Sequence, residues 1–114
     1  MESLMKLPNA DRAIIDRKKI YDYCLNNDHP RGKHKARVFL STLGFSSENT
    51  DELIAIIMNN IQGNNCFLGE GDKYGQRYIV DIEIHRNTEK AVVRTIWIIK
   101  TNESRPRLIT CFVK

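Results

Sequence analysis

The chain has 114 residues, a formal net charge of +4, 41% hydrophobic residues and 28% charged residues. This length is typical of one domain, and the composition is that of a folded soluble protein rather than a disordered one. No apolar run reaches the roughly 18 residues of a membrane-crossing helix, and no secretory signal is visible. The three cysteines have no CxxC spacing, which argues against a disulfide scaffold or a Cys-rich zinc site. We therefore expect a single cytoplasmic domain over residues 1–114, without a cofactor, a metal or a membrane partner.

The first half of the chain shows helical periodicity in three places. A helix capped by Asp16 is expected over residues 16–25, and a second helix over residues 33–43. A third helix is expected where Asn49 and Glu52 resemble a capping box. Its apolar stripe contains Leu53, Ile54, Ile57, Met58 and Ile61.

The second half changes to the alternation of β-strands. A short segment at 66–68 leads into a turn at 69–75, followed by strands at 76–85, 91–100 and 107–113. The strand at 91–100 is apolar on both sides, which predicts a central strand covered on both faces. The order predicts an α+β fold in which three N-terminal helices pack on a C-terminal antiparallel sheet of three to four strands.

Charge is unevenly distributed along the chain. Residues 1–45 and residues 71–114 each contain nine basic and five acidic side chains, whereas residues 46–70 contain four acidic and no basic ones. If the two basic segments meet in space, they form a positive surface that the net charge understates. The alternative is two unrelated solvated faces.

The densest basic cluster is the segment 29–37, HPRGKHKAR, with four permanent cations, two histidines and no acid. Gly32 at a helix entry frees backbone N–H groups, which would favour a phosphate there. His34 is the candidate for proton transfer, because imidazole changes its protonation near neutral pH. The alternative is a solvated basic turn with ordinary surface histidines.

Arg94 lies inside the apolar run 91–99, where an unpaired buried cation is strongly unfavourable. It either forms a salt bridge with Asp81 or Glu83, or faces a cleft in which it holds a phosphate bidentately. We favour the second interpretation. Nearby residues that extend the same surface are Arg105, Arg107 and Thr110.

Four stretches carry a resemblance to a known family, namely LPNA at 7–10, DHPRGKHKARVF at 28–39, VRTIW at 93–97 and PRLIT at 106–110. Over nearly its whole length the chain resembles an uncharacterised bacterial domain family, found as a C-terminal module of polymorphic toxins and as small stand-alone proteins. Its helices-then-sheet order is similar to that of the barnase, EndoU, colicin and RelE group of metal-independent ribonuclease toxins. The resemblance implies a toxin-like domain with a cognate antitoxin or immunity protein as its partner.

The positive surface and the resemblance together predict a metal-independent endoribonuclease toxin that cleaves RNA by attack of the 2′-OH on the adjacent phosphate. The predicted catalytic residues are His34 as base or acid, Arg94 and Arg107 as a phosphate clamp, Lys35 as a supporting cation, and Thr95 or Thr110 to orient the phosphate. The predicted RNA-binding residues are His29, Arg31, Lys33, Arg37 and Arg105. The alternative is a non-catalytic interaction module, either an immunity or antitoxin-like protein or a nucleic-acid binder.

Overall fold

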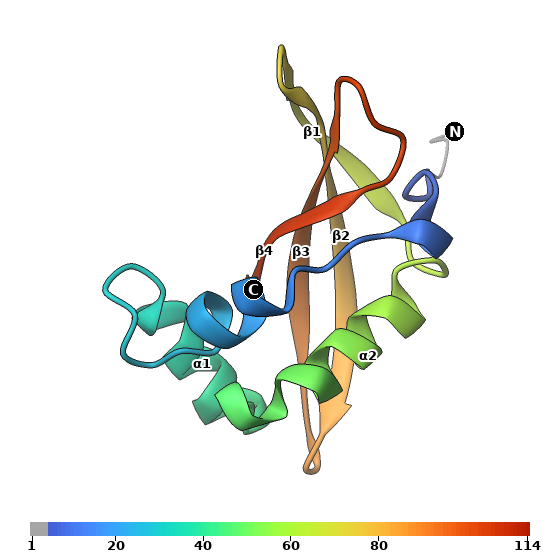
Figure 1. The fold of residues 1–114 in the computed structure, drawn as a ribbon. Helices are drawn as coiled ribbons and strands as arrows, with labels where there is room; N and C mark the ends of the chain where they lie inside the picture. The colour runs from blue at the N-terminus through green and yellow to red at the C-terminus, as the bar shows by residue number, and fades with distance from the viewer. Residues whose placement is uncertain (1–4) are drawn as a thin grey trace.

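The structure is a computed structural model that describes residues 5–114. Its elements in chain order are the 3₁₀ turn η1 (Ala10–Arg12), the π-helix η2 (Lys19–Cys24), α1 (Lys33–Leu43), the 3₁₀ turn η3 (Ser47–Asn49), α2 (Thr50–Asn60), β1 (Cys66–Asp72), β2 (Gly75–Arg86), β3 (Glu89–Lys100) and β4 (Arg107–Val113). In Figure 1 the helical segments lie across the sheet, while the β1–β2 turn and the β3–β4 loop extend beyond them. No helix within residues 5–114 is long and apolar enough to cross a membrane.

The predicted fold is wrong in its helical half. The sequence predicts three helices on the sheet, whereas the described residues contain two α-helices, and the segment 16–25 forms only the six-residue π-helix η2. Its wider turn is visible in the bond from the Leu25 N–H to the Ile20 carbonyl oxygen at 2.9 Å. Ile20 and Cys24 are nevertheless both buried, so the apolar spacing fits either kind of helix. The fold is α+β, with an N-terminal helical part and one four-stranded antiparallel sheet.

Two predicted boundaries also differ from the structure. The capping box forms between Ser46 and Asn49 rather than between Asn49 and Glu52, and it adds η3 before α2. The predicted turn at 69–75 is shorter than expected, because β1 continues to Asp72. The register shifts within β1, and such an irregularity accommodates glycines inside a strand.

The four strands form an antiparallel meander in the order β1-β2-β3-β4. On one face of β3, Val93, Thr95 and Trp97 are completely buried in the core. The opposite face, with Arg94 and Ile96, is only half-buried. The prediction that this strand is covered on both faces is therefore wrong, and the sheet keeps one partly open face.

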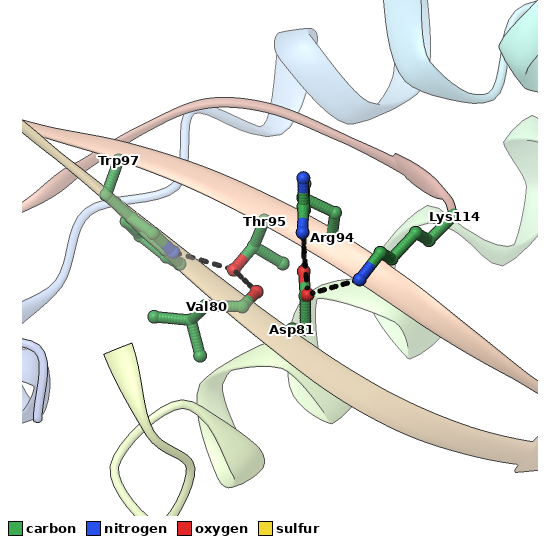
Figure 2. A network of polar contacts seen from close by, with 6 residues as sticks. All are labelled: Val80, Asp81, Arg94, Thr95, Trp97 and Lys114. Atoms are coloured by element: carbon green, nitrogen blue, oxygen red, sulfur yellow. Dashed lines mark hydrogen bonds and ion pairs between the residues drawn. The ribbon is translucent and has the colours of Figure 1, made fainter. Parts of the chain in front are cut away.

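A short polar network crosses the core between β2 and β3. The hydroxyl of Thr95 donates to the carbonyl oxygen of Val80 at 2.7 Å and accepts the indole N–H of Trp97 at 2.8 Å (Figure 2). All three residues are fully buried. Because each polar group has its partner, the network fixes the two strands without leaving an unsatisfied donor or acceptor.

Arg86 connects the β2–β3 hairpin to both α-helices. Its guanidinium binds the Glu52 carboxylate of α2 through two bonds of 2.7 and 2.9 Å. A third nitrogen donates to the Leu43 carbonyl oxygen at 2.8 Å, which satisfies a free carbonyl at the end of α1. The turn that follows Arg86 consists of Asn87 and Thr88, both at positive φ. The hairpin is thereby held in a defined position against the helical layer.

Candidate functional site

A cleft of about 490 Å³ opens between η2, α1 and β4. Its lining residues are Lys18, Lys19, Asp22, Tyr23, Lys35, Ile109 and Thr110. Two of the predicted site residues, Lys35 and Thr110, meet here from opposite halves of the chain. Figure 1 shows the three elements converging near the C-terminus. With three lysines against one aspartate, the lining is positive.

The cleft exists because α1 approaches η2 closely. A Cβ atom at Gly32 would lie 2.6 Å from the carbonyl oxygen of Tyr23, so only glycine permits this approach at the start of α1. On the other side, the Lys19 ammonium lies 3.5 Å from the Ile109 carbonyl oxygen of β4. The two segments therefore hold Tyr23 and Lys19 at the rim of one cavity.

The basic surface continues from the cleft onto the open face of the sheet. The Lys35 ammonium lies 4.5 Å from the centre of the Phe112 ring, a cation–π distance. Phe112 pairs with Arg94 across the β4–β3 ladder. The first basic segment thus reaches the neighbourhood of Arg94, as expected if the two basic segments meet.

Arg94 is engaged by a carboxylate of its own chain. Its guanidinium donates to the two oxygens of Asp81 at 2.9 and 3.0 Å, and the Lys114 ammonium binds the same carboxylate at 3.3 Å (Figure 2). Of the two interpretations of Arg94, the salt bridge is therefore present, with Asp81 rather than Glu83 as the partner. Together, Arg94, Lys114 and Asp81 carry a net positive charge, and the Arg94 side chain is 30% exposed.

The Asp81 ion pairs make stability depend on pH. Hydrogen bonds from Arg94 and then Lys114 lower the pKa of Asp81, against an opposing effect of burial. The stabilisation is fully present above the carboxyl pKa of the unfolded chain, about 3.9, and is lost as the pH falls through the lower folded pKa. We expect Asp81→Asn to cost about 1 kcal/mol at pH 7 and progressively less below about pH 4. Urea denaturation across this range checks the difference, and parallel curves for the two proteins would contradict it.

The second residue of the predicted clamp is also paired. The Arg107 guanidinium donates to both oxygens of Glu103 at 2.8 and 2.9 Å. Arg105 donates to the Arg12 carbonyl oxygen at 2.7 Å, which ties the β3–β4 loop to the N-terminal segment. A phosphate clamp made of Arg94 and Arg107 stays a prediction, and it requires an anion to displace two resident carboxylates.

The basic segment 29–37 is built around His29. The Nδ1 atom of His29 accepts the N–H groups of Arg31 and Gly32, both at 3.0 Å, and its ring packs edge-on against Tyr23 at 4.7 Å. The Gly32 N–H is thus used within the turn, which corrects the expectation that it is free for a phosphate. His29 supports the cleft by positioning Tyr23.

The other basic residues of this segment differ in exposure. Arg31, His34 and Arg37 are exposed, and Lys33 is half-buried. All four lie outside the lining of the cleft, where the segment contributes Lys35.

Thr95 is placed in the core rather than at a site. It is fully buried, and its hydroxyl is engaged on both sides by Val80 and Trp97. The expectation that Thr95 orients a phosphate does not agree with this placement, because the side chain is shielded from solvent and its hydroxyl already has two partners. Thr110 is only half-buried and lines the cleft, as the role of orienting a phosphate requires.

Two thiols lie beneath the cleft. The Cys24 sulfur is 3.8 Å from the Thr110 hydroxyl oxygen. A hydrogen bond with Cys111 lowers the pKa of Cys24 to about 7, and the same bond together with burial raises the pKa of Cys111. Both side chains are buried and neither lines the cleft, so they are not part of its reactive surface.

Sequence reasoning missed part of this arrangement. Lys18, Lys19 and Tyr23 line the cleft, and their signal was a basic pair directly before an apolar periodicity. It also did not predict the hydrogen bond from His85 Nε2–H to Glu83 Oε1, which is 2.8 Å long and lies on the open face of β2. The alternation of β2 places both side chains on that face, but the sequence does not show that they meet.

Comparisons with known proteins show the fold and the family of this chain. One chain of the contact-dependent growth inhibition toxin–immunity protein complex from Klebsiella pneumoniae 342 matches with a TM-score of 0.62 and 19% identity, covering 90% of this chain and 100% of that chain. At this identity the likeness shows the fold alone. No curated protein matches the sequence. A family model described as a domain of unknown function matches residues 6–114, and the chain therefore belongs to the DUF6883 family.

Proposed function

We propose that this domain is a toxin-type module that binds RNA at the basic cleft and cleaves it by attack of the 2′-OH on the adjacent phosphate. The observation that carries the proposal is the convergence of Lys18, Lys19 and Lys35 on one cleft. The fold it shares with a chain of a toxin–immunity complex supports the toxin-associated role. A cognate antitoxin or immunity protein is the partner that such a role requires.

The lining of the cleft suits a nucleotide. Ammonium groups neutralise the phosphate oxygens of an RNA backbone and so favour its binding. The Thr110 hydroxyl can donate to a phosphate oxygen, and the Tyr23 ring offers a flat surface to a base. The basic surface that runs past Phe112 toward Arg94 extends the path of the RNA backbone beyond the cleft.

Induced expression in a bacterial host tests the proposal. An active ribonuclease arrests growth and produces discrete RNA fragments, and the purified protein cuts a short single-stranded RNA in the presence of a chelator. Intact RNA in both assays at full protein expression would contradict cleavage.

Lys35→Ala should weaken RNA binding and reduce its salt dependence. Loss of one phosphate contact lowers the slope of log K against log salt concentration by about 0.7 for a single strand. Fluorescence anisotropy with a labelled RNA oligonucleotide measures this slope. Lys100→Ala is the matched control, because it removes an exposed lysine at the end of β3, outside the cleft. Equal slopes for the two variants would exclude Lys35 from the RNA path.

An interaction module is the second candidate. Internal carboxylates already bind Arg94 and Arg107, which suits a surface that recognises a protein rather than a scissile phosphate. An immunity protein leaves growth and RNA intact and protects cells that express the cognate toxin. A nucleic-acid binder retains RNA without cutting it, with an affinity that falls steeply as salt increases.

A further inference from the structure

We infer that Glu83 and His85, on the open face of β2, are the acid–base pair of the cleavage reaction. This inference rests on the proposed ribonuclease function and assigns its proton-transfer groups. The His85 Nε2 and Glu83 Oε1 atoms are 2.8 Å apart, and the side chains are 67% and 54% exposed. Both groups are therefore in mutual contact and open to a substrate.

The backbone beneath the pair is a regular β-strand. Glu83 and His85 alternate with Ile82 and Ile84, which are both buried in the core. The β2–β3 ladder runs without a register shift from Gly75 to Arg86. The two side chains therefore project from one regular strand, which fixes the separation of their Cα atoms.

Cations surround the pair on the same face of the sheet. Lys90 lies opposite His85 in the ladder, and Arg94 lies opposite Asp81, one alternation from Glu83. On the far side of β3, the Lys114 N–H donates to the carbonyl oxygen of Val92, which pairs with Glu83. The neighbourhood thus holds three cations and the Asp81 carboxylate, an arrangement that attracts a phosphate to the pair.

The adjoining hairpin turn adds a second observation. His85 lines a hollow of about 420 Å³ together with Arg86, Asn87, Thr88, Glu89 and Lys90. Thr88 has φ of 65°, a conformation that a β-branched residue rarely adopts. The two-residue turn between β2 and β3 requires positive φ at both of its residues, so the conformation of Thr88 belongs to the hairpin itself. Arg86 anchors this turn to the Glu52 carboxylate.

The reaction balances with these two groups alone. The scissile phosphate enters between the two exposed side chains and opens their contact, because the attacking and leaving oxygens lie on opposite sides of phosphorus. The Glu83 carboxylate takes the proton of the ribose 2′-OH, and the 2′ oxygen forms a bond to phosphorus. The bond between phosphorus and the 5′ oxygen breaks, and protonated His85 gives its proton to that leaving oxygen. The products are a 2′,3′-cyclic phosphate and a free 5′-OH, with no oxidant or metal consumed.

The pair lies within reach of RNA held at the cleft. Two strand spacings and four residues separate Thr110 from Glu83 in the ladders, a distance of about 16 Å. A few nucleotides of extended RNA span this distance, passing Phe112 and Arg94. The cleft then binds the flanking chain, and the open face carries the scissile phosphate.

His34 is the competing proton carrier. Among residues 5–114 its side chain makes no hydrogen bond or ion pair, whereas His85 has a carboxylate partner that orients it. Because His34 lies on α1 and His85 lies on β2, single substitutions test the role of each histidine independently.

A leaving-group experiment tests the assignment. RNA needs an acid for its leaving oxygen, whereas a ribonucleoside 3′-(4-nitrophenyl phosphate) does not, because 4-nitrophenolate leaves without a proton. We expect His85→Ala to lower RNA cleavage by about 10²–10⁴-fold and to change cleavage of the aryl ester by less than about tenfold. Glu83→Gln should lower both rates, because both substrates need the base. Glu48→Gln, at an exposed carboxylate of η3, serves as the control, and circular dichroism confirms folding of each variant.

Each outcome decides the assignment. Wild-type rates for the His85 and Glu83 variants would overturn it, as would an equal loss on both substrates for His85→Ala. A loss on RNA but not on the aryl ester for His34→Ala, with His85→Ala active, would transfer the acid role to His34. If the wild-type protein cuts RNA, these results bear on the pair alone. If it cuts neither substrate, the proposed function and the pair are both overturned.

Discussion

Trp97→Ala should lower the free energy of unfolding by about 3–5 kcal/mol, the range for removal of a buried large aromatic side chain. Trp97 is fully buried, and its indole N–H is bound by the Thr95 hydroxyl at 2.8 Å. The substitution leaves a cavity in the core and removes the donor that satisfies Thr95. Because Trp97 is the single tryptophan of the chain, far-UV circular dichroism in urea is the appropriate measurement.

Two further variants separate the contributions to this effect. Trp97→Phe keeps much of the ring volume and removes the N–H, so it should cost less than the alanine variant and more than zero. Tyr74→Ala removes an aromatic side chain that is 62% exposed and should change stability by less than about 0.5 kcal/mol. A Trp97→Ala protein as stable as the Tyr74→Ala protein would show that the core is not packed as described.

Gly75→Ala is expected to have the second largest effect. Gly75 begins β2 with φ of +152°, a conformation that L-residues avoid. A Cβ atom there would overlap the carbonyl oxygen of Ile99 and lie 2.8 Å from the Cα atom of Lys100, both of which belong to the backbone of β3. Backbone strain of this kind costs about 1–3 kcal/mol, and the overlap forces the two strands apart in addition.

Gly63→Ala is the matched control for this glycine. A Cβ atom at Gly63 has no atom within 4 Å, so alanine should be tolerated there and thermal unfolding should change little. Thermal unfolding followed by circular dichroism compares the two variants directly. Equal melting temperatures for Gly75→Ala and Gly63→Ala would contradict the close approach of β2 and β3.

Elements with a local signal were predicted from the sequence. The second predicted helix is α1, at residues 33–43, and Gly44 follows it at φ of 72°, the left-handed conformation that ends a helix. Alternation in the second half gave the strands β2 to β4, because a two-residue period is visible without knowledge of the partner strand. These features need only neighbours in sequence.

Features that depend on distant contacts were missed. The first predicted helix is a π-helix in the structure. The sequence does not show this, because the spacing of the buried residues Ile20 and Cys24 fits either kind of helical turn. The partner of Arg94 depends on register, which places Asp81 directly opposite it. Lys18 and Lys19 join the site only because η2 docks beside β4, a contact with no signature in the local sequence.

The carboxylate shared by Arg94 and Lys114 acts as an internal competitor for any anion that approaches these cations. A single inorganic phosphate would have to displace Asp81 unaided. A polyanion already tethered through the lysines of the cleft presents its next phosphate at a high effective concentration and overcomes the same competitor. A phosphate therefore binds Arg94 only when the same polyanion is already bound to the lysines of the cleft. The surface thus selects by chain length and binds oligonucleotides in preference to small anions.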